Sequence, residues 1–444
     1  MRSSLLAVLC FLLPAALASA DPPESRPPNI VLLLADDLGW GELGVQGGKD
    51  IPTPHLDALA QSGVRFTQAY VTCPVCAPTR AGLLTGRYQQ RFGFENNPGP
   101  QGTASGKFGL PRDQKTLAER LRERGYATGM FGKWHLGYEE GLRPTERGFD
   151  EFLGFLGGAH SYFAARAGGK AGGSILRGTE PVDEERYLTD ALGREAAQFV
   201  ARHRDEPFFL YVPFNAVHSP MQAPTEALER FPDIDDPRRQ TFAAMLSALD
   251  DSVGRVLAAL EKNGLSENTL VIFLADNGGP TPSTTSSNGI LRGTKATVWE
   301  GGIRVPFFVR WPTKIPGGKV DDRPVISLDV VPTVLAAVGA AAEKADRLDG
   351  VDLLPHLSGG NDARPHERLY WRFGEQAAIR QGDWKLVMPR GGEAQLFDLA
   401  SDPGETEDLF EEQPEIAAEL AEAWGDWSSE LMEPSWSRGN KRRR

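Results

Sequence analysis

The segment NIVLLLADDLGW, residues 29–40, constrains the fold more than any other part of the chain. Its apolar run continues without interruption until it ends in Asp36 and Asp37. A strand that is apolar at consecutive positions is buried on both faces, as in parallel sheets that helices cover. In open sheets of that kind, ligands bind beyond the carboxyl ends of the strands. The segment therefore predicts a central strand with a polar site at its end.

The order of elements in the rest of the chain agrees with such a sheet. Four segments each combine an amphipathic helix, a turn and an apolar strand: residues 53–71, 114–137, 189–220 and 241–280. This alternation indicates an α/β fold with a large, mostly parallel central sheet flanked by helices on both faces. In the first segment we expect a helix that ends at Gly63 and a single strand over 64–71.

The pattern of apolar and turn-forming residues changes after about residue 340. Residues 370–409 contain short apolar stretches between glycine and aspartate turns, which is typical of an antiparallel meander. Residues 414–431 have the spacing of one amphipathic helix. We therefore predict a large α/β domain over 21–345, a small C-terminal α+β domain with an antiparallel sheet over 346–432, and a basic tail over 433–444.

The first 20 residues have the features of a signal peptide. Arg2 precedes an apolar run, and Ala18-Ser19-Ala20 has the small-x-small pattern of a cleavage site. We expect cleavage after Ala20 and a secreted or periplasmic protein. No later stretch approaches the roughly 18 consecutive apolar residues of a spanning helix, so we expect no stable membrane anchoring. The net charge of −12 argues against nucleic acid as a partner.

Two pairs of oxygen-bearing side chains follow predicted strands. Asp36 and Asp37 follow the first strand, and Asp276 and Asn277 follow the strand that ends in LADNGGP. Adjacent carboxylates repel each other unless a cation or a hydrogen-bond network offsets them. Oxygen is the ligand that hard cations such as calcium and magnesium prefer. The two pairs therefore predict one divalent metal ion, and ligand type alone permits either element.

Basic side chains occur in loops that the same topology brings to this edge. Lys133 and His135 in GKWHLG share a face if the segment is extended, His218 follows another strand, and Lys295 lies in a glycine-rich loop. Each of them alone also fits a surface lysine or a packed histidine. Around a hard cation, together, they suit an anionic substrate, with positive charge to hold it and imidazoles for proton transfer.

The motif CPVCAPTR, residues 73–80, allows several interpretations. A structural zinc site is excluded because the sequence has no second cysteine pair. A disulfide or a redox pair formed by its two cysteines stays open. Pro78 suits the first turn of a helix that Gly86 can end, which places Cys76 at the helix N-terminus. A nucleophile there, with Arg80 one turn on, suits attack on an anionic ester.

The residues CAPTRAGLLTGR resemble the signature of the type I sulfatases of the alkaline-phosphatase-like superfamily. The similarity continues in order through NIVLLLADDLGWGELG, GKWHLG, ADNGG, GTKATVWEGGIRVP and LFDLASDPGETEDL. This resemblance implies a sulfuric ester hydrolase in which a formylglycine-generating enzyme converts Cys76 to formylglycine, whose hydrated aldehyde is the nucleophile. It also implies that Arg80 steadies that residue. The implied ligands of one calcium ion are the formylglycine oxygen at position 76, Asp36, Asp37, Asp276 and Asn277.

The resemblance assigns the basic residues as well. Lys133, His135, His218 and Lys295 would surround the sulfate. His218 would protonate the leaving oxygen, and His135 or Asp276 would take the proton that is released when the aldehyde is regenerated. Because conversion uses Cys76, the sulfatase and disulfide interpretations exclude each other.

The substrate is indicated only weakly. The long loop 154–173 contains His160, Tyr162 and Phe163, and loops of this kind commonly determine specificity. A histidine beside aromatic residues suits a sugar subsite, and a packed loop is the alternative. The aromatics of 370–373 either wall a pocket or pack in the core. With export, these features predict exo-acting cleavage of a sulfated carbohydrate, with His160 among its binding residues.

Two other functions stay open at this stage. A phosphatase or phosphonate monoester hydrolase of the same superfamily shares the α/β layout, but it typically uses threonine or serine and often two zinc ions with several histidine ligands. A non-catalytic carbohydrate-binding protein would result if Cys76 is not converted. A thiol redox protein is a third alternative.

Overall fold

The computed structural model describes residues 26–163, 173–340 and 346–436. The predicted signal peptide, its cleavage site after Ala20 and residues 437–444 of the predicted tail lie outside these residues. Among the helices in the described ranges, none combines the length and apolar character that crossing a membrane requires.

The strands and helices have the following bounds. The strands are β1 (Asn29–Ala35), β2 (Val64–Phe66), β3 (Ala69–Tyr70), β4 (Ala127–Lys133), β5 (Glu151–Phe155), β6 (Ile175–Arg177), β7 (Glu180–Val182), β8 (Phe208–Pro213), β9 (Thr269–Ala275), β10 (Phe307–Arg310), β11 (Lys319–Asp321), β12 (Val325–Ile326), β13 (Arg368–Phe373), β14 (Gln376–Gln381), β15 (Trp384–Met388) and β16 (Gln395–Asp398). The helices are α1 (Pro54–Gln61), α2 (Cys76–Thr85), α3 (Leu117–Arg122), α4 (Leu188–Arg202), α5 (Thr225–Leu228), α6 (Pro237–Lys262), α7 (Thr281–Thr284), α8 (Glu300–Ile303), α9 (Val330–Ala337), α10 (Leu354–Leu357) and α11 (Pro414–Ser429).

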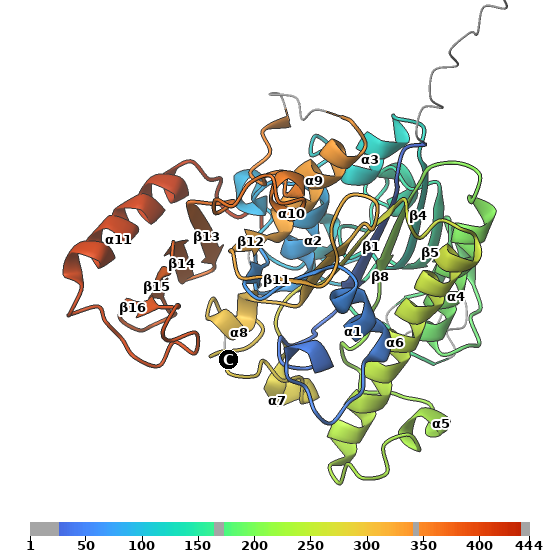
Figure 1. The fold of residues 1–444 in the computed structure, drawn as a ribbon, viewed down its shortest axis with the longest axis horizontal. Coiled ribbons are helices and arrows are strands. Elements are labelled where there is room, and N and C mark those ends of the chain that lie inside the picture. The colour runs from blue at the N-terminus through green and yellow to red at the C-terminus, as the bar shows by residue number, and fades with distance from the viewer. Residues whose placement is uncertain (1–25, 164–172, 341–345, 437–444) are drawn as a thin grey trace, which may run out of the picture.

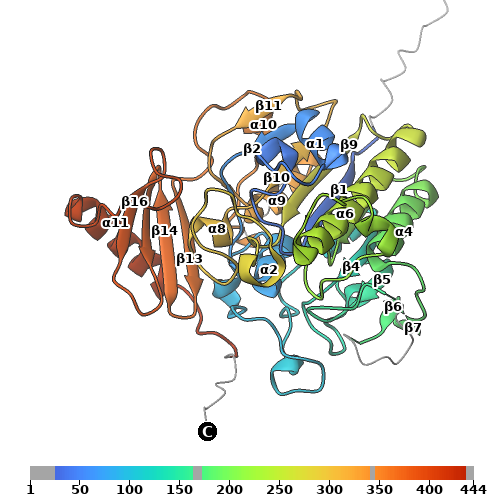
Figure 2. The same cartoon turned by 90° about the horizontal axis from the view of Figure 1, so that it is seen from below.

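One central sheet organises the large domain (Figures 1 and 2). Its strand order is β11-β2-β10-β9-β1-β8-β4-β5-β6-β7. The five consecutive strands β9, β1, β8, β4 and β5 are parallel to one another. Antiparallel pairing occurs on either side, where β10 opposes both its neighbours and β6 opposes β5 and β7. The predicted parallel sheet is therefore confirmed at the centre, and the whole sheet is mixed.

The side chains of β1 explain why its continuous apolar run lies at the centre of the sheet. Val31 and Leu33 belong to one core cluster, whereas Ile30 and Leu32 belong to the other, so successive side chains enter opposite layers. Helices α4 and α6 contribute to the first cluster, and α2, α3 and α9 contribute to the second. Figure 2 shows α4 and α6 on one side of the sheet and α2 and α9 on the other, as predicted.

The segment 64–71 differs from the single strand that its alternation predicts. Strand β2 joins the central sheet beside β10 and β11, whereas β3 leaves that sheet and pairs with β12. The preceding helix ends at Ser62 in ordinary right-handed geometry, so Gly63 is not its cap. Tertiary pairing with strands that are distant in the sequence thus overrides the local pattern.

The C-terminal sheet β13-β14-β15-β16 is fully antiparallel, and α11 packs on one of its faces (Figure 1). Its other face is continuous with the main core, because Trp371 is fully buried there. The indole nitrogen of Trp371 donates a hydrogen bond to the carbonyl of Val71 at 2.7 Å. The aromatics of 370–373 therefore include a core-packing anchor between the C-terminal sheet and the large domain.

A buried ion pair between His366 and Asp329 gives the stability of the fold a pH dependence. Nε2 of His366 lies 2.8 Å from Oδ1 of Asp329, whose carboxylate also accepts the backbone N–H groups of Ile326 and Val351. Burial lowers the pKa of His366, but the Asp329 carboxylate outweighs burial and raises it above 6.5. Because folding raises this pKa, the protonated imidazole contributes stability that is fully present below about pH 6.5 and is lost as pH rises through the folded-state value.

We therefore expect His366→Gln to lower the free energy of unfolding by roughly 1.5–3 kcal/mol at about pH 5.5 and by little at about pH 9, since a hydrogen bond to a charged group contributes that much. Urea denaturation of both proteins at the two pH values measures the difference. An equal effect at both values would contradict the account of this pair.

Candidate active site

The four polar groups that follow predicted strands meet at one edge of the sheet. Strands β9, β1, β8 and β4 are consecutive neighbours in the sheet. Asp276 and Asn277 follow β9, Asp36 and Asp37 follow β1, and His218 follows β8, while Lys133 is the last residue of β4. Parallel strands end at the same edge, so these side chains converge although they come from distant parts of the sequence.

Helix α2 brings Cys76 and Arg80 to the same place. Cys76 is the first residue of the helix, and Gly86 caps its end in the left-handed conformation with φ 69°. Arg80 is fully buried; its Nη2 and Nε lie 2.7 and 3.0 Å from Oδ2 of Asp276, and its Nη1 donates to the carbonyl of Lys133 at 2.8 Å. The guanidinium thus ties the helix that carries Cys76 to two strand ends.

The carboxylates and the amide offer an oxygen-rich site for a cation. Ligand atoms of Asp36, Asp37, Cys76 and His218 all lie within 4.8 Å of one another. The amide nitrogen of Asn277 donates to Oδ1 of Asp37 at 2.8 Å, which fixes the orientation of the amide. Its Oδ1 is buried and has no hydrogen-bond partner among the described residues. A buried oxygen without a donor fits a metal ligand, so the residues present fit a hard divalent ion.

The surrounding cations keep the two aspartates ionised. Burial would raise the pKa of Asp36, but Lys133, His218 and Arg80 together lower it below 3.8. Burial acts in the same direction on Asp37, where Lys295 is the largest of the charges that lower its pKa. Nζ of Lys295 lies 2.6 Å from Oδ1 of Asp37, and Nζ of Lys133 donates to Oδ2 of Asp36.

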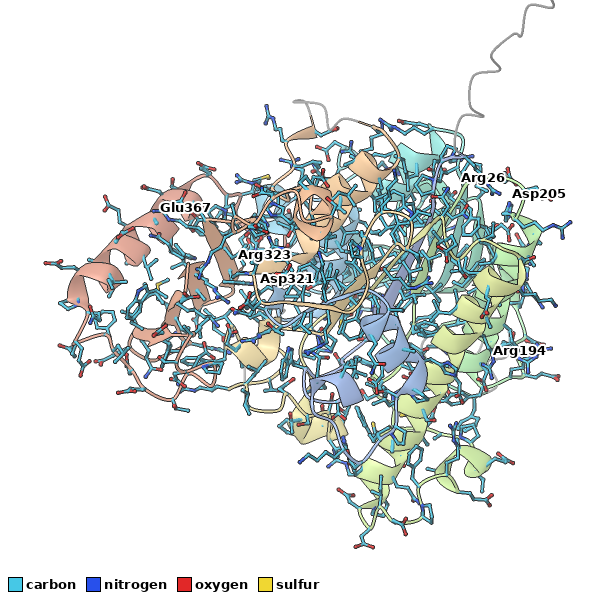
Figure 3. All side chains as sticks on the ribbon, in the orientation of Figure 1. Arg26, Arg194, Asp205, Asp321, Arg323 and Glu367 are labelled. Atoms are coloured by element: carbon cyan, nitrogen blue, oxygen red, sulfur yellow. The ribbon has the colours of Figure 1, made fainter. Side chains whose placement is uncertain are left out.

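This buried set contrasts with the charged side chains at the outer surface. Labelled charged side chains such as Arg194, Asp205 and Glu367 are exposed at the outer surface (Figure 3). Burying charges without partners is costly, so a cluster of ionised groups inside a protein indicates a functional centre.

The thiol of Cys76 is poorly suited to redox chemistry. Cys76 is 1% exposed and is not in a disulfide within the described part of the chain. Burial raises the pKa of the thiol to about 12, although Lys133 and Lys295 act to lower it. Redox cysteines have a lowered pKa and are accessible. The disulfide and redox interpretations of the motif are therefore not supported by this geometry.

The two histidines differ in their surroundings. His135 is 5% exposed, and burial together with the charge of Lys133 lowers its pKa well below 6.5, so the imidazole is neutral near pH 7. Nδ1 of His218 lies 2.6 Å from the carbonyl of Ser219, which can only accept, so Nδ1 carries a proton. Nε2 of His218 then faces Oδ2 of Asp37 at 3.6 Å.

The position of His135 depends on the glycine opposite its ring. A Cβ atom at Gly158 would lie 2.6 Å from Nε2 of His135, and the ring has little space to move because it is buried. We expect Gly158→Ala to lower kcat/KM by about 10–100-fold, since a displacement of about 1 Å has effects of that size. Hydrolysis kinetics of the variant measure it.

The matched control is Gly425→Ala, because a Cβ atom in that part of α11 meets nothing within 4 Å. Unchanged kinetics in Gly158→Ala, with both variants folded by thermal melting, would contradict the role given to His135.

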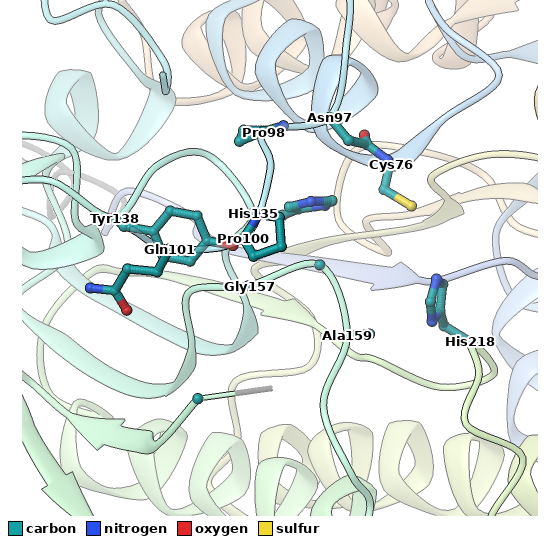
Figure 4. A pocket seen from close by; sticks show the side chains of 12 residues that line it. Cys76, Asn97, Pro98, Pro100, Gln101, His135, Tyr138, Gly157, Ala159 and His218 are labelled. Carbon is teal, nitrogen blue, oxygen red and sulfur yellow. The ribbon is translucent and has the colours of Figure 1, made fainter. Parts of the chain in front are cut away.

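A cavity of about 630 Å³ opens beside Cys76, His135 and His218. Figure 4 shows these three side chains around one space, with Asn97 next to Cys76. The remaining lining residues are Asn97, Pro98, Pro100, Gln101, Tyr138, Gly157, Gly158, Ala159 and Gly173. Oδ1 of Asn97 accepts a hydrogen bond from the backbone N–H of Ala77 at 3.0 Å, so Asn97 also supports the first turn of α2.

The predicted subsite residues of the loop 154–173 lie elsewhere. His160 is 3% exposed, and its two ring nitrogens contact the carbonyls of Ser161 and Gly173. It is not among the described residues that line the cavity. The hydroxyl of Tyr162 lies 2.7 Å from the carbonyl of His218, so Tyr162 contacts the backbone of the loop that carries His218. Phe163 is 42% exposed, and residues 164–172 lie outside the described part of the chain.

Comparison with known proteins places this chain among the sulfatases. The family model described as Sulfatase matches residues 28–340, and the model described as N-sulphoglucosamine sulphohydrolase, C-terminal, matches 294–426. The chain is 36% identical to human (Homo sapiens) arylsulfatase A, over 87% of this chain and 84% of that protein. It is 37% identical to the solved structure of Ps i-CgsB in complex with k-i-k-neocarrahexaose, with a TM-score of 0.88 over 93% of this chain and 95% of that one. A phosphonate monoester hydrolase of Agrobacterium radiobacter shares the fold, with 22% identity and a TM-score of 0.69 over 91% and 96% of the two chains.

Proposed function

The chain belongs to the sulfatase family and is a sulfuric ester hydrolase, and from this premise we propose that its substrate is a sulfate ester on a carbohydrate. We further propose that formylglycine made from Cys76 and one calcium ion complete the site, and that the chain acts after export to the periplasm or beyond. The observation that carries the proposal is the convergence of Lys133, Lys295 and Arg80 on the three aspartates of the site, next to a cavity that Cys76 and two imidazoles line.

The lysines suit a sulfate group at this position. Nζ of Lys295 lies 3.3 Å from Sγ of Cys76, the atom whose place a formylglycine oxygen would take, and Lys133 is fully buried against Asp36. Positive charge fixed in a water-poor site stabilises the charge that moves onto sulfate oxygens in the transition state. The formylglycine hydrate, when present, supplies a nucleophilic hydroxyl and a second hydroxyl that a thiol lacks.

The histidines suit the two proton transfers. With both nitrogens protonated, His218 can donate from Nε2 to the leaving alcohol, while the contact between Nδ1 and the Ser219 carbonyl holds the ring. His135 is neutral because burial lowers its pKa, so it can accept a proton at the other side of Cys76. Arg80 donates two hydrogen bonds to Oδ2 of Asp276, which fixes the orientation of this carboxylate as a ligand or an acceptor.

The calcium ion would be held by Asp36, Asp37, Asp276 and Asn277. Its chemistry there is to offset the clustered carboxylates and to polarise sulfate oxygens. Calcium added to the chelator-treated protein is expected to raise stability by about 2.7 kcal/mol at 100 times its Kd, because it binds only the folded chain. Thermal melting measures this, and chelation should also abolish hydrolysis. Equal stabilisation and recovery with magnesium would contradict the choice of calcium.

The wall of the cavity suits a sugar ring. Asn97, Gln101 and Tyr138 contribute amide and hydroxyl side chains to the lining of the cavity that contains Cys76, which is the kind of lining that binds carbohydrate hydroxyls. Ps i-CgsB, with its neocarrahexaose complex, supports the same substrate class. The sulfate must pass the cavity to reach Lys133, and a terminal sugar residue enters more deeply than an internal one, so we propose exo action.

The experiment is a substrate screen with the protein co-expressed with a formylglycine-generating enzyme. Sulfated oligosaccharides, steryl sulfate, 4-nitrophenyl sulfate and 4-nitrophenyl phosphate are compared by kcat/KM. We expect the highest value for an oligosaccharide sulfated at its terminal residue. A higher value for steryl sulfate would overturn the carbohydrate proposal, and one for the phosphate would overturn sulfate preference. N-terminal sequencing of protein from its native host tests export, which predicts a start at Asp21.

A further inference from the structure

Lys295 lies in a segment with little regular structure. Residues 292–304, the Lys295 segment, contain only the short helix α8 within the described chain, yet Nζ of Lys295 is held 2.6 Å from Oδ1 of Asp37. A lysine on such a segment needs support from its surroundings to stay in one position, because its side chain is long and flexible. The residues that contact this segment provide that support.

The C-terminal domain contacts this segment near its start, at Ala296 and at Glu300. Nε2 of Gln376, the first residue of β14, donates to the carbonyl of Ala296 at 3.0 Å. Nη1 of Arg292 donates to the carbonyl of Glu405 at 2.9 Å. At the other end, Nζ of Lys385 on β15 lies 2.8 Å from Oε1 of Glu300. The segment that carries an active-site lysine is therefore fastened to the second domain.

Ala296 is the point where these contacts meet the active site. Its φ of 69° is left-handed, a conformation that costs an alanine roughly 1–2 kcal/mol. Its N–H donates to the carbonyl of Pro74 at 2.8 Å, two residues before Cys76, and its own carbonyl accepts from Gln376. Such a conformation persists only where neighbouring groups hold it. Gln376 supplies one of the two bonds that do so, directly next to Lys295.

We infer that Gln376 is a positioning residue for Lys295, so that the C-terminal domain forms part of the support of the sulfate site. This inference rests on the proposed role of Lys295 in binding sulfate. The isosteric change Gln376→Glu keeps the shape of the side chain but replaces the donor by a carboxylate that repels the Ala296 carbonyl. Gln376→Ala removes the donor without repulsion, and the half-buried position tolerates the loss of atoms.

The test is a double-mutant cycle with Lys295→Ala, measured as kcat/KM for 4-nitrophenyl sulfate. We expect each Gln376 variant to lose about tenfold, the effect of one hydrogen bond to a positioned group, and to lose nothing further in the Lys295→Ala background. Binding of inorganic sulfate to the unconverted Cys76 protein, by calorimetry, should weaken by a similar factor in the Gln376 variants. This second measurement needs no turnover.

The matched control is Gln381→Glu at the other end of β14, where the side chain contacts the exposed Glu419 at 2.8 Å. It should leave both measurements unchanged. Equal losses in the wild-type and Lys295→Ala backgrounds would mean that Gln376 acts on the fold in general, which overturns the inference. Unchanged activity of Lys295→Ala alone would overturn the proposed role of Lys295 as well, whereas a deficient Lys295→Ala with normal Gln376 variants overturns only the positioning role.

Discussion

Replacement of Cys76 by alanine or serine is expected to abolish sulfate ester hydrolysis, by at least about 1,000-fold in kcat, which is the scale on which enzymes lose activity without their nucleophile. Neither residue is a substrate for the oxidation of cysteine to formylglycine in a host that matures the cysteine motif. The site around position 76 stays intact, because Arg80 contacts Asp276 and Lys133 rather than the thiol. Initial rates of the purified variants measure the effect.

The control is Cys73→Ala, three residues earlier in the same motif. Cys73 is also buried, but it is not among the residues that line the cavity in the described chain. The variant should keep its activity, apart from a modest loss of stability from the smaller side chain. Normal turnover in Cys76→Ala, or a loss in Cys73→Ala as large as in Cys76→Ala, would contradict the assignment of position 76 as the nucleophile.

Replacement of Lys385 by methionine is expected to have the largest effect on stability, about 3–5 kcal/mol, the usual cost of leaving a buried charge without its partner. Lys385 is fully buried, and its Nζ lies 2.8 Å from the carboxylates of both Glu300 and Glu405. These three residues join α8 to β15 and to the loop after β16. Denaturant unfolding of both proteins measures the loss. Arg390→Met is the matched control, because it breaks an exposed ion pair with Glu375 and should cost less than about 1 kcal/mol.

The loss of stability in Lys385→Met should be smaller at low pH than at high pH. Burial would raise the pKa of Glu300, but Lys385 and Arg304 outweigh it and lower the pKa to about 2, so this group contributes stability above about pH 4.5 that is lost as pH falls. Burial, with repulsion from Glu300, raises the pKa of Glu405 to about 7. Without Lys385 both carboxyls bind protons more readily. We therefore expect a smaller loss at about pH 5 than at about pH 8, and the reverse order would contradict the network.

Much of the fold can be predicted from apolar residues whose pattern indicates which faces are buried. Residues 30–35 are apolar at every position, so both faces of the strand are apolar, as in a strand between two helical layers. The site followed from the same logic, because Asp36 and Asp276 stand directly after such runs and His218 lies in the loop after a third. The cysteine motif and the sulfatase signature then indicated the chemistry.

The rest depends on contacts that leave no local pattern in the sequence. Asn97 and Tyr138 line the cavity, but they lie in proline- and glycine-rich loops without periodicity. The signal that could have found Asn97 is its place in the loop shortly after the cysteine helix. Gln376 reaches Ala296 across 80 residues, and β3 leaves the central sheet because it pairs with β12. Each of these positions depends on contacts between residues that are distant in the sequence, and local propensity does not predict such contacts.

The measurement that tests the central claim most directly is the mass of the tryptic peptide that ends at Arg80 and contains Cys76, taken from protein isolated from its native host. The account predicts that residue 76 has lost its sulfur and gained a carbonyl oxygen, which is the mass of formylglycine. An unmodified thiol at Cys76 in protein that still hydrolyses sulfate esters, or a disulfide between Cys76 and Cys73, would contradict it.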